Sequence, residues 1–359
     1  MRKEIYRQDE AAARQLLAQA RVVHLASTDG DGRPILRALH AVLLPGGLYF
    51  HGAPAGEKLA VIGRPAVVCA EEIVAEIPSY FLDPERACPA TTYYDSVQVR
   101  GTVTAVEDAD EKAAALQALM QKYQPEGGHQ PIRADDPLYR KAVSGVLVLR
   151  LPIDAIDGKA KLGQNRSPEE LRSILEKLWQ RGLPEDPRAI DLVATRLVER
   201  QGASALPDFL RGPRDARLCC ALGPADADQA VGLLRDAYWN TWPSAAQMRQ
   251  AHLGSTAWVG ARDAAGLLVA TARALSDGGK FALIYDVMVD SAWRGCGLGH
   301  AVVGLLLQHP RLRHTPRIWL RTRDAMDFYR RYGFVAAQEL PPQPYVSTDM
   351  WLIREPGAG

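Results

Sequence analysis

The first 150 residues of the chain alternate between short apolar stretches and turn-forming residues. Apolar stretches at residues 22–27, 34–44 and 48–51 are separated by Asp-Gly and Pro-Gly-Gly sequences, which favour tight turns. This pattern predicts three strands joined as an antiparallel meander. Further strands are expected at residues 66–71, 97–106 and 145–152. Many short strands with few helices are typical of a small β-barrel.

Helical patterns flank this β-rich region. Helices are predicted at residues 9–20, 108–123, 167–181 and 189–199, with a short one from Lys58 to about Gly63. Ser167 caps the third of these and Pro168 follows it, which is a typical helix start. Residues 201–215 then carry prolines, glycines and a serine between regular segments. We expect a domain at residues 1–200, a linker at 201–215 and a second domain at 216–359.

Strands and helices alternate in the C-terminal part. A strand is expected at residues 216–222, a helix at 225–237, a hairpin of strands at 256–261 and 267–276, and a buried strand at 282–289. A helix with an apolar face begins near His300. Such alternation predicts an α/β domain with a central sheet.

Composition narrows the class of protein. The chain has 359 residues, which suggests two domains at the usual ~100–200 residues per domain. Its net charge of +1 gives no general affinity for nucleic acid. The five cysteines form no Cys-x-x-Cys pair, which fits a reducing compartment. With no apolar signal segment at the start and no run of ~18 apolar residues, we expect a cytoplasmic protein without a membrane span or a metal site.

The most informative stretch follows the buried strand at 282–289. It is Arg294-Gly295-Cys296-Gly297-Leu298-Gly299, and the helix of His300 comes next. A helix N-terminus has unpaired N–H groups and a partial positive charge, so it attracts phosphate. Glycine lets the backbone approach a ligand closely, and Arg294 can add a charge-assisted bond to the same phosphate.

This stretch resembles the acetyl-CoA signature Arg/Gln-x-x-Gly-x-Gly/Ala of the GNAT N-acetyltransferases. Residues 325–334, Ala-Met-Asp-Phe-Tyr-Arg-Arg-Tyr-Gly-Phe, resemble the second signature of that family. The resemblance covers about residues 217–354. It implies a mixed central sheet and transfer of an acetyl group from acetyl-CoA to a small amine.

The same resemblance implies site residues. The exposed edge of Met288 and Val289 would pair with the pantetheine of acetyl-CoA. The pyrophosphate would lie against a turn and helix start formed by Arg294, Gly295, Cys296, Gly297, Leu298, Gly299 and His300. Tyr329 would protonate the leaving thiolate, although Tyr332 shares its expected helix face. Asp286 is the candidate base, acting directly or through water, and Cys296 is not expected to act as a nucleophile. The aromatic residues at 238–243 either line the acceptor site or pack in the core.

The N-terminal part resembles the FMN-binding split barrel of the pyridoxamine-phosphate-oxidase superfamily, and in particular its nitroimidazole-resistance-like members. Three segments carry the resemblance, at residues 25–34, 49–58 and 94–101. It implies an antiparallel split β-barrel with peripheral helices, and a homodimer whose interface completes the flavin site. The implied FMN ligands are Arg37, His40, His51, Gly52, Lys58 and Ser96. Arg37 and His40 are three apart and would point to opposite faces of a regular strand.

A further segment, residues 158–165, resembles the Lys-x-Lys-Leu-Ser-Gln-Asn sequence of FMN-binding negative-transcriptional-regulator relatives. Lys159, Lys161 and Asn165 either reach an anionic ligand or form a solvated basic loop.

Together these observations predict an acetyltransferase fused to a flavin-dependent oxidoreductase domain. Two alternatives stay open: a barrel that binds flavin without turnover and regulates the transferase, and a barrel that binds haem. The sequence names neither the acceptor amine nor the electron donor.

Overall fold

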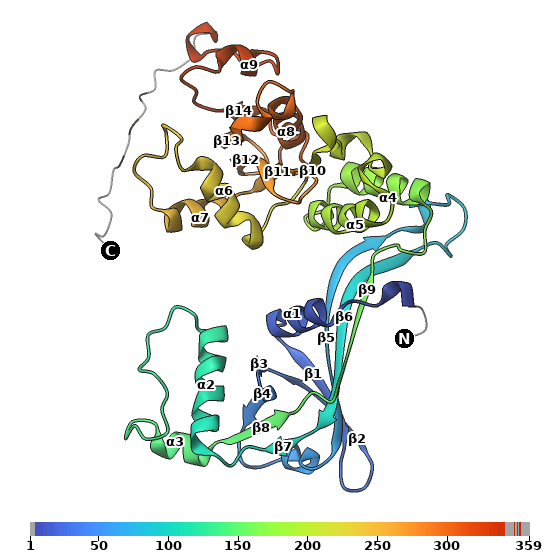
Figure 1. Ribbon diagram of the computed structural model, residues 1–359, viewed down its shortest axis with the longest axis vertical. Coiled ribbons are helices and arrows are strands. Elements are labelled where there is room, and N and C mark those ends of the chain that lie inside the picture. The colour runs from blue at the N-terminus through green and yellow to red at the C-terminus, as the bar shows by residue number, and fades with distance from the viewer. Residues whose placement is uncertain (1–3, 342–347, 349, 351, 353–359) are drawn as a thin grey trace.

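The computed structural model describes residues 4–341, 348, 350 and 352. Two antiparallel sheets build the N-terminal part (Figure 1). One sheet has the strand order β2-β1-β5-β6-β9, and the other has the order β3-β4-β8-β7. The strands of the first are β1 Val23–Thr28, β2 Pro34–Leu39, β5 Pro65–Ile77, β6 Thr91–Thr102 and β9 Ala155–Lys161. Those of the second are β3 Val42–Leu44, β4 Gly47–Gly52, β7 Thr104–Ala105 and β8 Leu147–Leu151. The expected antiparallel barrel is therefore confirmed.

The predicted three-stranded meander is wrong, because the strand expected at residues 34–44 is broken. β2 pairs with β1 in one sheet, whereas β3 pairs with β4 in the other. Between them, the backbone of Ala41 bonds to side chains of α2 (Ala109–Tyr123). The hydroxyl of Tyr123 lies 3.2 Å from the N–H of Ala41, and Lys122 Nζ donates to its carbonyl at 2.8 Å. These long-range bonds replace strand pairing at the corner between the sheets.

Two strands extend much further than the sequence pattern indicated. β5 and β6 pair from Pro65–Thr102 to Ile77–Thr91, and β9 lines the other edge of β6. β9 itself was not predicted, because Gly158 and two lysines obscure its alternation. The distal end of this ribbon meets α4 (Pro168–Arg181) and α5 (Asp186–Gln201), as Figure 1 shows. The N-terminal helix α1 (Glu10–Gln19), capped by Asp9, and the short α3 (Arg140–Gly145) complete the first half.

The helix pair α4–α5 also packs on the C-terminal sheet. Leu175 of α4, Ile190 of α5 and Val259 of that sheet belong to one continuous buried cluster. Ser167 caps α4 through a complete capping box, as expected. Residues 201–215 form short 3-10 turns, and Leu206 and Leu210 within them are buried in the same cluster.

Within the described residues, the C-terminal half contains a five-stranded mixed sheet of order β10-β11-β12-β13-β14. Its strands are β10 Arg217–Cys219, β11 Ala257–Arg262, β12 Leu268–Ser276, β13 Phe281–Val289 and β14 Arg317–Trp319. Among these five strands, β13 and β14 pair in parallel and the others are antiparallel, so the mixed α/β architecture is confirmed. The helices are α6 Ala227–Leu234, α7 Ala245–Leu253, α8 Leu298–Leu307 and α9 Met326–Arg330. Within the described ranges, no helix is both long and apolar enough to cross a bilayer.

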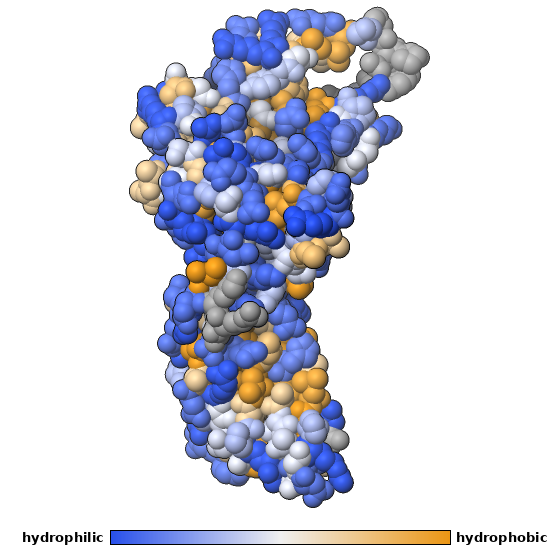
Figure 2. All heavy atoms as spheres, turned by 90° about the vertical axis from the view of Figure 1, so that its right-hand side faces the viewer, coloured by the Kyte–Doolittle hydropathy of each residue, from blue (hydrophilic) through white to orange (hydrophobic). Residues whose placement is uncertain are grey.

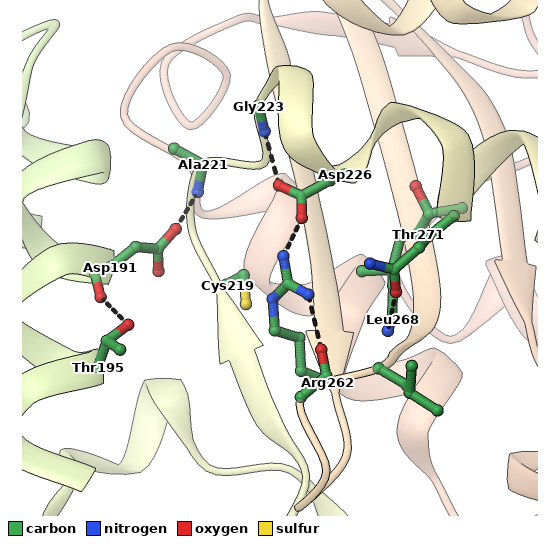
Figure 3. Close-up of polar contacts among 12 residues, drawn as sticks. Asp191, Thr195, Cys219, Ala221, Gly223, Asp226, Arg262, Leu268 and Thr271 are labelled. Carbon is green, nitrogen blue, oxygen red and sulfur yellow. Dashed lines mark hydrogen bonds and ion pairs between the residues drawn. The ribbon is translucent and has the colours of Figure 1, made fainter. Parts of the chain in front are cut away.

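Polar contacts fasten α5 to the edge strand of this sheet (Figure 3). Asp191 of α5 accepts hydrogen bonds from the N–H groups of Cys220 at 2.9 Å and Ala221 at 2.7 Å. Beyond them, Arg262 of β11 is paired with the buried Asp226. A carboxylate that accepts two backbone N–H bonds fixes the segment that leaves β10 against the helix pair.

Candidate functional site

Strand β13 separates from its neighbours just before the glycine-rich turn. β14 pairs only with Phe281, Ala282 and Leu283 of β13, so the edge from Ile284 to Val289 has no strand partner among the described residues. On its other edge β13 bulges against β12, because Arg273 lies opposite Tyr285 while Thr271 lies opposite Met288. Met288 and Val289 therefore lie on an edge of β13 that no described strand pairs with, directly before the turn.

The turn after β13 leaves backbone donors free. Gly295 and Gly297 have φ values of 74° and 92°, a left-handed conformation that side chains other than glycine disfavour. No hydrogen bond among the described residues uses the N–H groups of Leu298, Gly299 or His300 at the start of α8. Unpaired donors at the positive end of a helix dipole are the groups that an anion-binding site uses.

Two side chains of the turn point back toward the protein. Arg294 Nε donates to the carbonyl of Val289 at 3.1 Å, and its Nη2 lies 3.7 Å from the sulfur of Met288. The thiol of Cys296 donates to the carbonyl of Trp293 at 3.0 Å. Arg294 therefore connects the strand end to the turn, and the sulfur of Cys296 faces backbone.

A cavity of ≈ 660 Å³ opens beside the bulge of β13. Its aromatic lining consists of Tyr238, Trp239, Trp242, Tyr285, Trp319 and Tyr329. The side chain of Trp242 is 75% exposed, and Tyr238 and Trp239 are also exposed. Of the two interpretations of residues 238–243, the structure thus favours a ligand-lining role over core packing.

The structure separates the two candidate tyrosines. Tyr329 lines the cavity, half-buried between Phe328 and Phe334, and burial raises the pKa of its hydroxyl to about 12. Tyr332 lies beyond the end of α9, where its hydroxyl donates to the carbonyl of His300 at 2.8 Å. Only Tyr329 faces the cavity, and its phenol remains protonated at neutral pH.

Asp286 forms the floor of the cavity and is fully engaged. Its Oδ2 accepts from Arg273 Nε at 2.6 Å, and its Oδ1 accepts from Trp239 Nε1 at 2.9 Å. The carboxylate is 8% exposed, and its backbone has a φ of 49°, which is unusual for a residue other than glycine. The guanidinium of Arg273 and the indole of Trp239 therefore hold this carboxylate in place, which gives Asp286 a positioning role. Its role as the base, directly or through water, stays a prediction.

In the N-terminal half, three predicted FMN ligands lie together. His51 and Gly52 end β4, and Lys58 Nζ donates to the carbonyl of His51 at 3.2 Å. A Cβ on Gly52 would lie 2.6 Å from Lys58 Nζ, so glycine allows the lysine to fold over the strand end. His51 and Gly52 line an open pocket of ≈ 740 Å³, and Lys141, which sequence reasoning missed, lines it too. Burial and the charge of Lys58 lower the pKa of His51, which keeps this imidazole neutral.

Of the other three predicted ligands, only His40 lies close enough to His51 for its charge to help lower the pKa of that imidazole. His40 stacks on Tyr123, with ring centroids 4.5 Å apart, in the break between β2 and β3. Arg37 is exposed on β2, which ends at Leu39, so Arg37 and His40 do not belong to one regular strand. Ser96 lies on β6, in the same sheet as β2, and is paired with Glu71 and Lys159.

The two lysines of the segment 158–165 form hydrogen bonds within the protein. Lys159 Nζ bonds to the hydroxyl of Tyr94 at 2.5 Å, and Lys161 bonds to Thr91. Both therefore extend along β6, which favours a structural role over an anion site. Asn165 is exposed in the loop that precedes α4.

Comparison with known proteins matches both halves to families. The model of the pyridoxamine 5'-phosphate oxidase family matches residues 9–160, and the model of the acetyltransferase (GNAT) family matches residues 228–334. The uncharacterized N-acetyltransferase ycf52 of Pyropia yezoensis is 39% identical over 75 residues, which are 21% of this chain and 43% of that protein. The chain thus spans less than half the length of this curated relative.

Two solved structures are similar to one half each. A candidate 5-nitroimidazole antibiotic resistance protein from Bacteroides thetaiotaomicron is 24% identical, with 42% of this chain and 84% of that chain covered and a TM-score of 0.32. A candidate acetyltransferase of the GNAT family from Xanthomonas campestris is 29% identical, with 38% of this chain and 96% of that chain covered and a TM-score of 0.32.

Proposed function

Because the chain joins a domain of the pyridoxamine 5'-phosphate oxidase family to a GNAT acetyltransferase domain, we propose that it acetylates a small amine with acetyl-CoA and binds FMN in its first domain. One observation carries the transferase part. A Cβ on Gly299 would lie 3.6 Å from Phe328, so the start of α8, with its free N–H groups, adjoins α9. Tyr329, the residue after Phe328 on α9, lines the aromatic cavity. The anion site and the acceptor cavity are thus joined.

The proposed chemistry is direct transfer. The uncharged amine attacks the thioester carbonyl, so a C–N bond forms and the C–S bond breaks. Tyr329 gives its proton to the departing thiolate, and the proton released by the amine returns through solvent to the phenolate. Asp286 holds Arg273 and Trp239 in place and so fixes the shape of the cavity.

For the first domain, the residues at the end of β4 suit a flavin phosphate. Lys58 supplies an ammonium group over the end of β4, where Gly52 gives close access to the backbone. Lys141 adds an ammonium group to the pocket that His51 and Gly52 line. Bound FMN would supply redox chemistry at this position, next to the neutral imidazole of His51. We propose that a homodimer completes this site and that Arg37, His40 and Ser96 contribute from the surrounding surface.

Calorimetry with acetyl-CoA tests the transferase assignment without knowledge of the acceptor. We expect the wild type to bind acetyl-CoA and Gly297→Val to bind it at least about tenfold more weakly, because the branched side chain blocks the N–H donors. Gly304→Ala is the matched control, since Gly304 lies later in α8 and a Cβ there meets no atom within 4 Å. Circular dichroism checks that each variant is folded. The assignment fails if the wild type does not bind acetyl-CoA, or if Gly297→Val binds it as well as the wild type.

A further inference from the structure

A separate cleft of ≈ 420 Å³ lies where the helix pair α4–α5 meets the edge of the C-terminal sheet. One wall consists of Pro184, Pro187 and Arg188 at the start of α5. The opposite wall is the segment 220–224 after β10, which Asp191 anchors (Figure 3). None of its lining residues lines the acceptor cavity. Its volume is in the range of small-molecule sites.

The cleft contains a buried imidazole with a free acceptor. His252 of α7 is 1% exposed, and its Nδ1 lies 2.8 Å from the carbonyl of Met248. A carbonyl only accepts, so Nδ1 carries the proton and Nε2 presents a lone pair. Burial lowers the pKa of His252, which keeps the ring neutral. Nε2 has no hydrogen-bond partner among the described residues, and an unpaired buried acceptor is costly.

The unpaired charge in the lining of the cleft is positive. Arg188 and Arg311 line it, and its lining includes no carboxylate. Arg188 is paired with Glu72 of β5, whereas the side chain of Arg311 makes no ion pair or hydrogen bond within the described part of the chain. Apolar surface from Leu222, Leu253 and Trp258 fills much of the remaining wall.

We propose that this cleft binds a small organic anion that carries a hydroxyl group on an apolar body. The hydroxyl donates to Nε2 of His252, the carboxylate pairs with Arg311, and the apolar part contacts the prolines and leucines. A hydroxyl is favoured over an ammonium donor because two arginines line the cleft and no lining residue is acidic. α7 also supplies Gln247, Met248 and Ala251 to the acceptor cavity, so one helix forms a wall of both sites.

Mandelate is a suitable probe because it combines a hydroxyl, a carboxylate and a ring. Phenylacetate lacks only the hydroxyl, and mandelamide lacks only the charge. By calorimetry we expect both to bind at least about fivefold more weakly than mandelate, as one lost polar contact predicts. His252→Leu should remove the difference between mandelate and phenylacetate, and Arg311→Gln should remove the difference between mandelate and mandelamide.

Two further measurements show whether mandelate binds in this cleft or in the acceptor cavity. Trp242→Ala, in the acceptor cavity, should leave the affinity for mandelate unchanged, and the ¹⁵N signal of His252 Nε2 should shift when mandelate binds. Arg311 is exposed, so its variant tests the site even if His252→Leu does not fold. The proposal is overturned if mandelate does not bind at millimolar concentration, if the three compounds bind equally well, or if the Trp242 variant alone weakens binding.

Discussion

Tyr329 and Tyr332 show how local geometry separates two residues that the sequence could not. Their spacing suggested a shared helix face, but α9 ends at Arg330, so Tyr332 turns toward α8. The hydroxyl of Tyr332 contacts both the carbonyl and Nδ1 of His300, whereas the structure shows no hydrogen bond for the hydroxyl of Tyr329 among the described residues. A free, protonated hydroxyl in the cavity is what a general acid requires.

Tyr329→Phe should lower kcat by ~10²–10⁴-fold and change the affinity for acetyl-CoA little, because the ring and its packing remain. Tyr332→Phe is the control and should keep kcat close to that of the wild type. Both need a panel of amines with detection of the released thiol, followed by calorimetry with acetyl-CoA. Equal kcat values for the wild type and Tyr329→Phe would exclude the phenol as the acid.

The pH dependence of kcat provides a second test of this residue. Because burial raises the pKa of Tyr329 to about 12, its acid form persists far above neutral pH. We therefore expect that ionisation of Tyr329 causes no fall in kcat up to about pH 10. A fall in the wild type near pH 9 that is absent in Tyr329→Phe would contradict this expectation.

Lys58 gives the most direct test of the proposed FMN site. Lys58→Ala should weaken FMN binding by about 1.5–3 kcal/mol, or roughly 10- to 150-fold, because a charge-assisted phosphate contact is lost. Lys58→Arg keeps the charge and should retain most of the affinity. Flavin fluorescence quenching measures both. Unchanged affinity in Lys58→Ala would remove this residue from the flavin site.

At the scale of elements, contacts between distant residues decide what the sequence could not predict. The apolar pattern runs through residues 34–44 without interruption, and only Lys122 and Tyr123 of α2 reveal the break at Ala41. β5 continues past Glu71 and Glu72, where the alternation stops, because Glu72 pairs with Arg188 of α5. In contrast, Asp9, Asp108 and Ser167 cap their helices as local sequence predicts.

The candidate sites show the same contrast between local features, which the sequence predicts, and long-range contacts, which it does not. The glycine-rich turn could be predicted because it depends on local backbone conformation. The ion pair of Asp286 could not, since Arg273 lies on another strand and the bulge brings it into position. The position of Arg273 within the apolar stretch of β12 was the one feature of the sequence that could have indicated this ion pair.

His309 lies where the C-terminal half packs against α4, and its protonation should affect the stability of the protein. It is 3% exposed and packs edge-on against Trp179 of α4, with centroids 5.7 Å apart. Burial lowers its pKa from 6.5 to about 4, so the unfolded chain binds a proton between these pH values and the folded chain does not. The free energy of unfolding is therefore highest above pH 6.5 and should fall by up to about 3 kcal/mol as the pH drops to 4.

His309→Gln is neutral throughout this range and should flatten that part of the pH dependence, although it lowers stability at pH 7. Urea unfolding followed by tryptophan fluorescence at several pH values measures the slope. If wild type and variant lose stability equally between pH 6.5 and 4, His309 does not cause the loss.

At the scale of the whole molecule, α4 and α5 connect the two halves (Figure 1). Arg181 at the end of α4 donates to the carbonyl of Glu76 on the β5–β6 ribbon at 2.7 Å. Arg313 of the C-terminal half donates to the carbonyls of Trp179 and Gln180 at 2.7 Å each. The last turn of α4 is therefore held both by the β5–β6 ribbon and by the C-terminal half.

The surface of the N-terminal half bears on its oligomeric state. Figure 2 shows hydrophobic residues scattered over a largely hydrophilic surface. In the N-terminal half, Leu36 is 62% exposed on β2, and Leu138, which lines the pocket of His51 and Gly52, is 65% exposed. Apolar side chains at the margin of an open pocket are suited to contact with a second protein surface.

We therefore expect FMN binding and dimer formation to depend on each other. A second copy would cover the open side of the pocket, so flavin-loaded protein should sediment as a dimer. Leu138→Asp places a charge at the pocket margin and should weaken both dimer formation and FMN affinity, whereas Leu267→Asp, on an exposed residue of the transferase half, should change neither. Analytical ultracentrifugation with absorbance at the flavin band and at 280 nm reports both quantities in one experiment. A monomer that carries flavin at full occupancy would show that one chain is sufficient for the site.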